Sequence, residues 1–199
     1  MPKLGMAKIR RKQLVEAAIA TIHENGFAQA TVARIARRAG VSNGIVHHYF
    51  ASKDDLLFET MRSLLADLRR DAVARLRRAS SPQERLQAVI DASFGDGQFG
   101  DHVFSAWLAL YGNARKSERL QQIVMLYHRR LHANLVYGLR QMVGNAAANR
   151  LAESIASMID GLWLRYALLG PPASADIPRA LTRRCLDGLL VQESCAPAQ

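Results

Sequence analysis

The chain has 199 residues, of which 49% are hydrophobic and 22% are charged, and its formal net charge at pH 7 is +10. This composition excludes an intrinsically disordered chain, and the length fits a small domain fused to one larger domain with a core. The sequence has no run of 18 apolar residues and no charged-then-apolar leader, so we expect no membrane span, no signal peptide and a cytoplasmic protein.

The N-terminal quarter of the chain is predicted to be helical and strongly basic. A first helix covers about residues 7–25 and ends at Gly26, with Leu14, Ala18 and Ile22 on its inner face. Residues 1–53 contain nine Lys or Arg and two Glu, so most of the excess positive charge lies here. Phosphate backbones attract such a patch, which therefore favours a nucleic-acid partner.

Two short helices joined by a glycine turn are predicted within residues 31–53. The first has an apolar stripe at i, i+3, i+4 and i+7, and Gly40 supplies the left-handed backbone conformation that ends it. Ser42 is a good N-cap for the second helix, whose inward residues are Val46 and Phe50. Such a helix-turn-helix places its second helix in the DNA major groove, whereas an ordinary helical hairpin in a core is the alternative.

The rest of the chain also shows helical patterns without strand alternation, so the predicted fold class is all-α. Ser52 caps a helix that continues to about Arg78, with Asp55 at the capping-box position, and the sequence Ser81-Pro82-Gln83-Glu84 starts another. A glycine-rich break follows at residues 95–100. Further helices are predicted at residues 103–111, 118–143, 151–169 and 178–191, and a disordered tail at residues 193–199.

Several motifs resemble those of a known family. The stretch TVARIARRAGVSNGIVHHYFASKDDLL at residues 31–57 resembles the signature of TetR-type transcriptional regulators. MPKLGM at 1–6, IRR at 9–11 and IDGLWLR at 159–165 resemble one branch of that family, the choline-sensing repressors of glycine betaine synthesis. The resemblance implies a TetR-like fold, with a three-helix helix-turn-helix domain at residues 8–68 and a ligand-binding and dimerisation domain at residues 69–199.

The helix-turn-helix and the resemblance together predict a set of contacts with double-stranded operator DNA. Lys53 is expected to anchor a phosphate together with the amides that begin its helix. One departure from the family is His47, because many members have at that position a Tyr that touches a phosphate. The full predicted set is Thr31, Arg34, Arg38, Ser42, Asn43, Gly44, Ile45, His47, His48, Tyr49 and Lys53.

The last two predicted helices suggest self-association. The helix at residues 151–169 is apolar nearly all round and needs two neighbours, and the next helix repeats Leu181, Cys185 and Leu189 at i, i+4 and i+8. Periodicity alone leaves packing within one subunit open. The resemblance implies a homodimer, and two recognition helices spaced by one DNA turn, ~34 Å, would suit a palindromic operator.

A candidate sensor site combines aromatic rings with one acid. Trp107 and Tyr111 are i, i+4 neighbours, and Asp160 and Trp163 are i, i+3 neighbours. Aromatic faces attract a quaternary ammonium through cation–π interactions, and a carboxylate neutralises its charge, which is the chemistry that choline requires. The alternative is that the rings are core and that Asp160 pairs with Arg165 or another Arg. Further candidate rings are Phe94, Phe99, Tyr127 and Tyr166.

Metal and catalytic sites are not predicted, and neither is a cofactor. His128 and His132 are one turn apart, but H-R-R-L-H lacks the glutamate of H-E-x-x-H, so we expect a solvated pair. Cys185 and Cys195 form no C-x-x-C pair, which argues against a zinc site or a disulfide framework. The sequence contains no nucleophile elbow, phosphate-cradling loop or spaced carboxylate pair, so we expect no enzyme.

These observations predict a homodimeric repressor that a small molecule releases from its operator by a population shift. By resemblance, the ligand is choline and the controlled genes make glycine betaine. One alternative is the same architecture sensing a different cationic or aromatic compound. Another is a basic helical protein that binds acidic membrane lipid, and sequence-specific binding to DNA upstream of the chain's own gene would exclude it.

Overall fold

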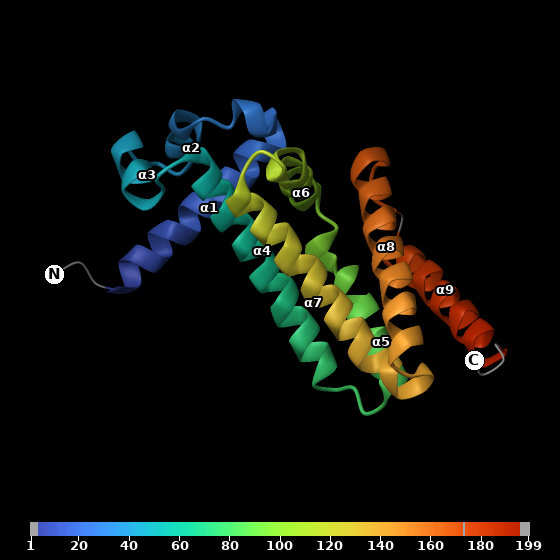
Figure 1. The fold of residues 1–199 in the computed structure, drawn as a ribbon. Coiled ribbons are helices and arrows are strands. Elements are labelled where there is room, and N and C mark those ends of the chain that lie inside the picture. Colours follow the sequence, from blue (N-terminus) through green and yellow to red (C-terminus); the bar gives the residue numbers. More distant parts are fainter. Residues whose placement is uncertain (1–3, 173, 196–199) are drawn as a thin grey trace. The chain divides into compact units, whose positions relative to one another are not determined.

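A computed structural model describes residues 4–172 and 174–195, which form helices joined by turns and loops, with no strand among the described residues (Figure 1). The predicted all-α fold class is therefore confirmed. Residues 1–3 of the N-terminal motif and residues 196–199 of the predicted tail lie outside the described residues. The elements are α1 (Leu4–Gln29), α2 (Val32–Arg38), α3 (Asn43–Tyr49), α4 (Lys53–Leu76), α5 (Pro82–Ser93), the short 3-10 helix η1 (Asp96–Gln98), α6 (Asp101–Ala114), α7 (Glu118–Val143), α8 (Asn145–Leu169) and α9 (Asp176–Cys195).

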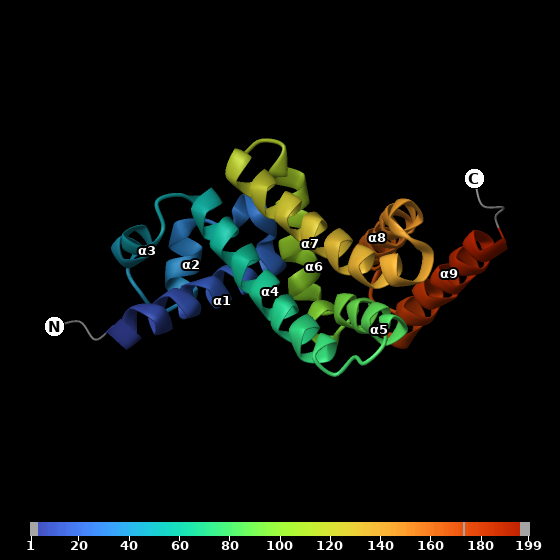
Figure 2. The ribbon, with the colours of Figure 1, turned by 60° about the horizontal axis from the view of Figure 1, so that its bottom comes forward.

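The chain divides into two compact units. The first consists of Met1–Ala66 and Gly100–Val124, and the second of Asp67–Phe99 and Met125–Gln199. In the first unit, α1 packs against α2 and α6, and α2 packs against α3. In the second unit, α9 packs against both α5 and α8, and α8 and α9 lie side by side in Figures 1 and 2.

The helix-turn-helix in the first unit follows from local sequence signals. Thr31 accepts a hydrogen bond from the Arg34 amide and caps α2, and Gly40 has φ +64°, as its predicted role in the turn requires. Gly26 also has a positive φ and kinks α1 sharply. The helix was predicted to end at Gly26, but it continues for one more turn to Gln29. The core between α1, α2 and α3 is formed by apolar residues from each helix: Leu14, Val15, Ala17, Ala18, Ile35, Ala36, Ala39, Val46 and Phe50.

Capping signals also set the starts of α4 and α5. The Asp55 amide donates to Ser52 Oγ at 3.0 Å, and the Glu84 amide donates to Ser81 Oγ at 3.1 Å. The Glu84 carboxylate in turn accepts from the Ser80 amide at 2.6 Å. Both predicted helix starts are therefore confirmed, and α5 then presents its apolar face to a core that it shares with α7, α8 and α9.

Several predicted helix boundaries were wrong. Helix α6 continues through Gly112-Asn113 to Ala114, where the Asn113 amide group donates to the Ala109 carbonyl at 2.7 Å. Helix α8 begins at Asn145, directly after Gly144 with φ +77°, rather than at residue 151. Helix α9 runs to Cys195, so residues 193–195 of the predicted tail are helical, and Glu193 forms an ion pair with Arg150 of α8 at 2.9 Å.

Candidate DNA-binding surface and effector site

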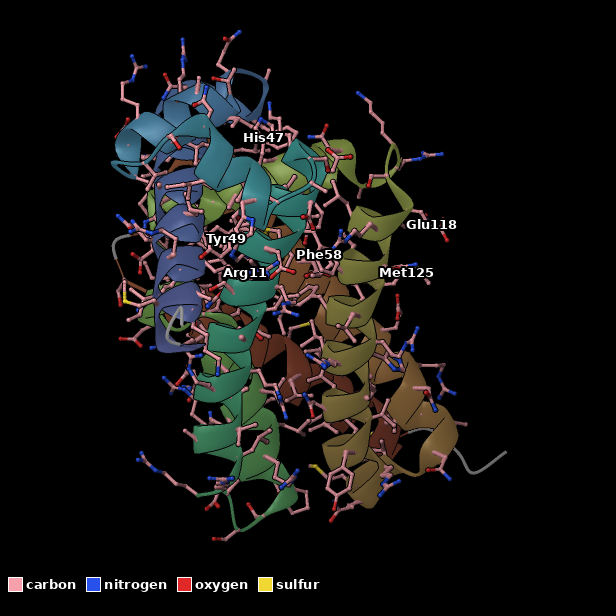
Figure 3. The ribbon with its side chains drawn as sticks, turned by 90° about the vertical axis from the view of Figure 1, so that its left-hand side faces the viewer. Arg11, His47, Tyr49, Phe58, Glu118 and Met125 are labelled. Carbon is pink, nitrogen blue, oxygen red and sulfur yellow. The ribbon has the colours of Figure 1, made fainter. Side chains whose placement is uncertain are left out.

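Helix α3 separates an inner from an outer face in the way that its sequence predicts. Val46 and the following Phe50 are 1% and 2% exposed. The outer residues Asn43, Gly44, Ile45, His47 and His48 are exposed. Figure 3 labels His47 and Tyr49 of this helix, and Tyr49 packs against the core shared with α1. The ring of Tyr49 is half-buried and packs edge-on against the His48 ring, with 5.1 Å between the ring centroids. Ile45 is the one large apolar side chain among the exposed residues of α3.

The two predicted arginines of α2 have partners near the end of α1. Arg34 donates to the Asn25 side chain at 2.9 Å, and Arg38 forms an ion pair with Glu24. Exposed ion pairs of this kind contribute only about 0 to 1 kcal/mol, so a DNA phosphate could compete for Arg38 at small cost. Ser42 begins α3 through its backbone, but its side chain makes no capping hydrogen bond, unlike the prediction.

Lys53 begins α4 and points toward the end of α1. Its ammonium donates to the Ala28 carbonyl at 2.9 Å and lies 4.3 Å from the centroid of the Phe27 ring. Burial lowers the pKa of Lys53, and the charge of Asp54 opposes this shift. An ammonium has three N–H donors, so the bond to Ala28 leaves capacity for a phosphate oxygen.

We expect Lys53→Ala to weaken binding to operator and to random DNA alike. Loss of a charge-assisted phosphate contact should cost about 1.5 kcal/mol, roughly tenfold in affinity. The slope of log affinity against log salt should fall by about one unit per lost contact. Fluorescence anisotropy at several salt concentrations measures both effects, with Lys53→Arg as the charge-preserving control. A change confined to base preference would contradict the phosphate role.

We expect Asn43→Ala to change which base is preferred at one symmetric pair of operator positions. The exposed amide of Asn43 at the start of α3 can make paired hydrogen bonds to a base edge, whose loss costs about 1 to 3 kcal/mol of discrimination. Gly44, exposed beside it, allows close approach, and Ile45 can contact a thymine methyl group. Binding to a set of operators with each base at these positions measures the preference profile. An unchanged profile would remove Asn43 from base readout.

A buried acid connects the loop after α3 with the start of α7, and the sequence analysis missed this link. Asp55 is 9% exposed; its carboxylate accepts from the Ala51 amide at 3.0 Å and pairs with Arg119 at 2.7 Å. The Arg119 guanidinium also lies 4.2 Å from the Phe58 ring, which Figure 3 shows on the side of α4 that faces α7. Within the first unit, these contacts tie the segment after the recognition helix to the first turn of α7.

In the second unit, Asp160 lies at a junction of α7 and α8. Its Oδ1 accepts a hydrogen bond from the Tyr127 hydroxyl at 3.1 Å, and its Oδ2 lies 3.2 Å from His128 Nδ1. The Asp160 side chain is 28% exposed and that of His128 is 44% exposed. His128 is thus exposed to solvent, as the predicted pair of solvated histidines requires, but it also has an acidic partner that the prediction did not include. The partners of Asp160 are a phenol and an imidazole rather than the arginine that the sequence analysis considered.

Aromatic rings gather elsewhere in the same unit. Phe94 is fully buried, Phe99 lies 5.7 Å from it between ring centroids, and Tyr166 lies 6.0 Å from Phe99. The sequence predicts all three only as further candidate rings for the effector. Rings at such separations stabilise one another by about 0.5 to 1.5 kcal/mol, and they can also offer faces to a cation.

The four residues of the predicted cage are divided between the two units. Trp107 and Tyr111 belong to the first unit, where their rings lie 5.6 Å apart and Trp107 is 4% exposed. Asp160 and Trp163 belong to the second, where Trp163 is 8% exposed. A common pocket for all four therefore stays a prediction.

In the described part of the chain, no group of three or more potential metal ligands comes together. None of its helices is both long and apolar enough to cross a membrane.

Two family models match the chain. Residues 14–60 match bacterial regulatory proteins of the tetR family, and residues 82–191 match the C-terminal domain of BetI-type transcriptional repressors. The HTH-type transcriptional regulator BetI of Brucella suis is 44% identical over 200 residues, which cover 100% of this chain and 98% of that protein. BetI of Rhizobium meliloti is 47% identical over 182 residues, with 92% and 90% covered.

Solved structures share the fold. A regulator-like protein from Pseudomonas aeruginosa PAO1 superposes with a TM-score of 0.82 at 27% identity, covering 93% of this chain and 92% of that chain. A protein from Saccharomonospora viridis, solved in complex with choline, superposes with a TM-score of 0.72 at 23% identity, covering 89% and 95%. The second likeness shows a shared fold alone.

Proposed function

The chain belongs to the TetR family of bacterial regulatory proteins and has a BetI-type C-terminal domain, and from this premise we propose that choline releases it from its operator. It is a DNA-binding transcriptional repressor. The expectation from its motifs that it is a TetR-type regulator is therefore confirmed. Its relatives are regulators rather than enzymes, and this confirms the prediction that the chain is not an enzyme. We place the DNA-binding domain at residues 8–68, the ligand-binding and dimerisation domain at residues 69–199, and the protein in the cytoplasm.

The dimer would form through α8 and α9. Large apolar side chains are exposed near the end of α8 and in the first turns of α9, and a monomer rarely leaves such a group uncovered. A second copy of the chain would bury them in an interface related by two-fold symmetry, which suits a palindromic operator. The residues concerned are Leu164, Leu168, Leu169, Ile177 and Leu181.

The effector would bind at Asp160. This acid is partly exposed, and Trp163 follows it by one helical turn, so a negative charge and an aromatic face occur together on α8. A trimethylammonium group needs both, because rings replace its hydration and the carboxylate neutralises it. The protein of the same fold that binds choline supports this choice of ligand. Trp107 and Tyr111 remain the rings that the sequence predicts for the same ligand.

Release from DNA requires that choline bind one subunit geometry better than another. A ligand shifts an equilibrium only by its difference in affinity for the two states. If the geometry that choline favours fits the operator poorly, choline lowers the affinity for DNA, and the genes of glycine betaine synthesis are then transcribed. Sensing of a different cationic or aromatic compound by the same dimer is the alternative.

Calorimetry on the purified protein tests the choice of effector. Choline, glycine betaine and a tertiary-amine analogue are titrated separately. Choline should bind most tightly, because unlike the tertiary amine it carries a permanent positive charge and unlike glycine betaine it has no carboxylate. Absence of heat with choline at millimolar concentration would refute choline as the effector. Heat with the tertiary amine alone would instead support the alternative ligand class.

A further inference from the structure

Both carboxylate oxygens of Asp160 are engaged within the protein. Tyr127 donates to Oδ1, and His128 Nδ1 lies 3.2 Å from Oδ2. A carboxylate only accepts hydrogen bonds, so His128 Nδ1 carries a proton, and protonation of Nε2 would make the ring a cation. Asp160 can therefore hold an imidazolium at the place where the effector's ammonium is expected.

We propose that His128 is the protein's own counter-ion for Asp160, and that a quaternary ammonium effector binds there by expelling the proton that His128 carries. The imidazolium gives its Nε2 proton to the solvent, the ring stays neutral with its Nδ1 proton, and the effector supplies the positive charge. Total charge at the site is conserved, since one cation replaces another. This inference rests on the proposed function and adds a residue that sets how effector binding depends on pH.

The electrostatic surroundings of His128 support this role. The hydrogen bond with Asp160 raises the pKa of His128 above its ordinary value of 6.5, partial burial opposes the rise, and the charges of Asp160 and Glu153 add to it. Both acids are on α8, while on α7 the exposed Arg129 and the half-buried His132 are the neighbouring basic groups. An effector cation beside Asp160 would cancel most of the attraction between Asp160 and a charged His128 ring. The pKa of His128 should therefore fall when the effector binds.

The direction of the pH effect follows from these shifts. A raised pKa in the folded protein means that the His128–Asp160 pair stabilises the fold fully below pH 6.5, and that this contribution is lost as pH rises through the raised value. The same proton competes with the effector. Affinity for choline should therefore increase with pH, by at most about tenfold per unit, between the lower pKa of the bound form and the raised pKa of the free form.

Calorimetry in two buffers of different ionisation enthalpy counts the protons released when choline binds. Near pH 7 we expect a measurable proton release of at most about one proton per subunit, because one group titrates. His128→Gln keeps a hydrogen-bond donor toward Asp160 but cannot titrate, so it should release no proton and bind choline with an affinity that is constant between about pH 6 and 8. The matched variant His132→Gln, one turn further along α7, should release protons like the natural protein.

Three outcomes would overturn the inference. Binding of choline without proton release contradicts the displacement while leaving the proposed function intact. Equal proton release in His128→Gln assigns the proton to another group. No binding of choline at any pH contradicts the proposed function and the displacement together.

The counter-ion role also has a test that needs no effector. Nuclear magnetic resonance follows the His128 ring protons as pH changes, in the natural sequence and in Asp160→Asn. We expect the pKa of His128 to lie above 6.5 in the natural protein and to fall toward that value in the variant. Identical titration curves would show that Asp160 does not hold the imidazolium.

Discussion

Asp160→Asn should weaken choline binding by about 2 to 3 kcal/mol, roughly 30- to 150-fold, because it removes the negative charge that faces the ammonium. The substitution preserves the size of the side chain, and an amide oxygen can still accept the Tyr127 hydroxyl, so the contact between α7 and α8 is kept. Operator DNA should still bind, but choline should no longer release it. Calorimetry with choline and anisotropy with labelled DNA measure the two effects.

Glu153→Gln is the matched control. It removes a carboxylate from the same helix, two turns earlier, where the side chain is exposed. Loss of an exposed charge changes affinity by about 1 kcal/mol at most. If Asp160→Asn and Glu153→Gln lowered the affinity equally, the effect would reflect the general charge of α8, and the direct role of Asp160 would be wrong.

Phe50→Ala should destabilise the helix-turn-helix by about 3 to 5 kcal/mol, the usual cost of emptying a buried phenylalanine site. Phe50 is 2% exposed, closes the core under α3, and lies beneath the Arg11 guanidinium at 5.2 Å. The variant should lose operator binding, because α3 can hold its outer residues in place only while its inner face is packed. Urea unfolding and DNA anisotropy provide the measurements.

Phe50→Leu tests the same site with a smaller loss of volume. It should cost less than half as much as Phe50→Ala and keep measurable operator binding, since an apolar side chain still fills most of the site. Full operator affinity in Phe50→Ala would contradict the role of this core in positioning α3.

Local signals made much of the first unit predictable. The positive φ of Gly40 and the cap at Ser52 depend on neighbours within three or four residues, which a sequence displays directly, although the predicted Ser42 side-chain cap did not form. The same reasoning failed at Gly112-Asn113, where the Asn113 side chain satisfies a carbonyl of the preceding turn and α6 continues. A turn residue such as Asn therefore indicates a helix end only when its side chain does not hydrogen-bond a carbonyl of the preceding helical turn.

Contacts between distant segments were the part that sequence reasoning could not supply. Asp55 carried a visible capping signal, but nothing in the spacing indicated Arg119 as its second partner. Asp160 and Tyr127 are 33 residues apart, and helical periodicity says which face a residue occupies without saying which helix covers it. The polar partners of a predicted binding residue thus depend on helix packing, and here they changed the chemistry assigned to His128.

Titration of choline into the protein bound to DNA from upstream of its own gene tests the central claim most directly. We expect millimolar choline to lower the DNA anisotropy and to weaken operator affinity by about 5- to 150-fold, and the operator to weaken choline binding by the same factor. Glycine betaine at the same concentration should have little effect. Operator affinity that stays unchanged while choline demonstrably binds would contradict release by choline.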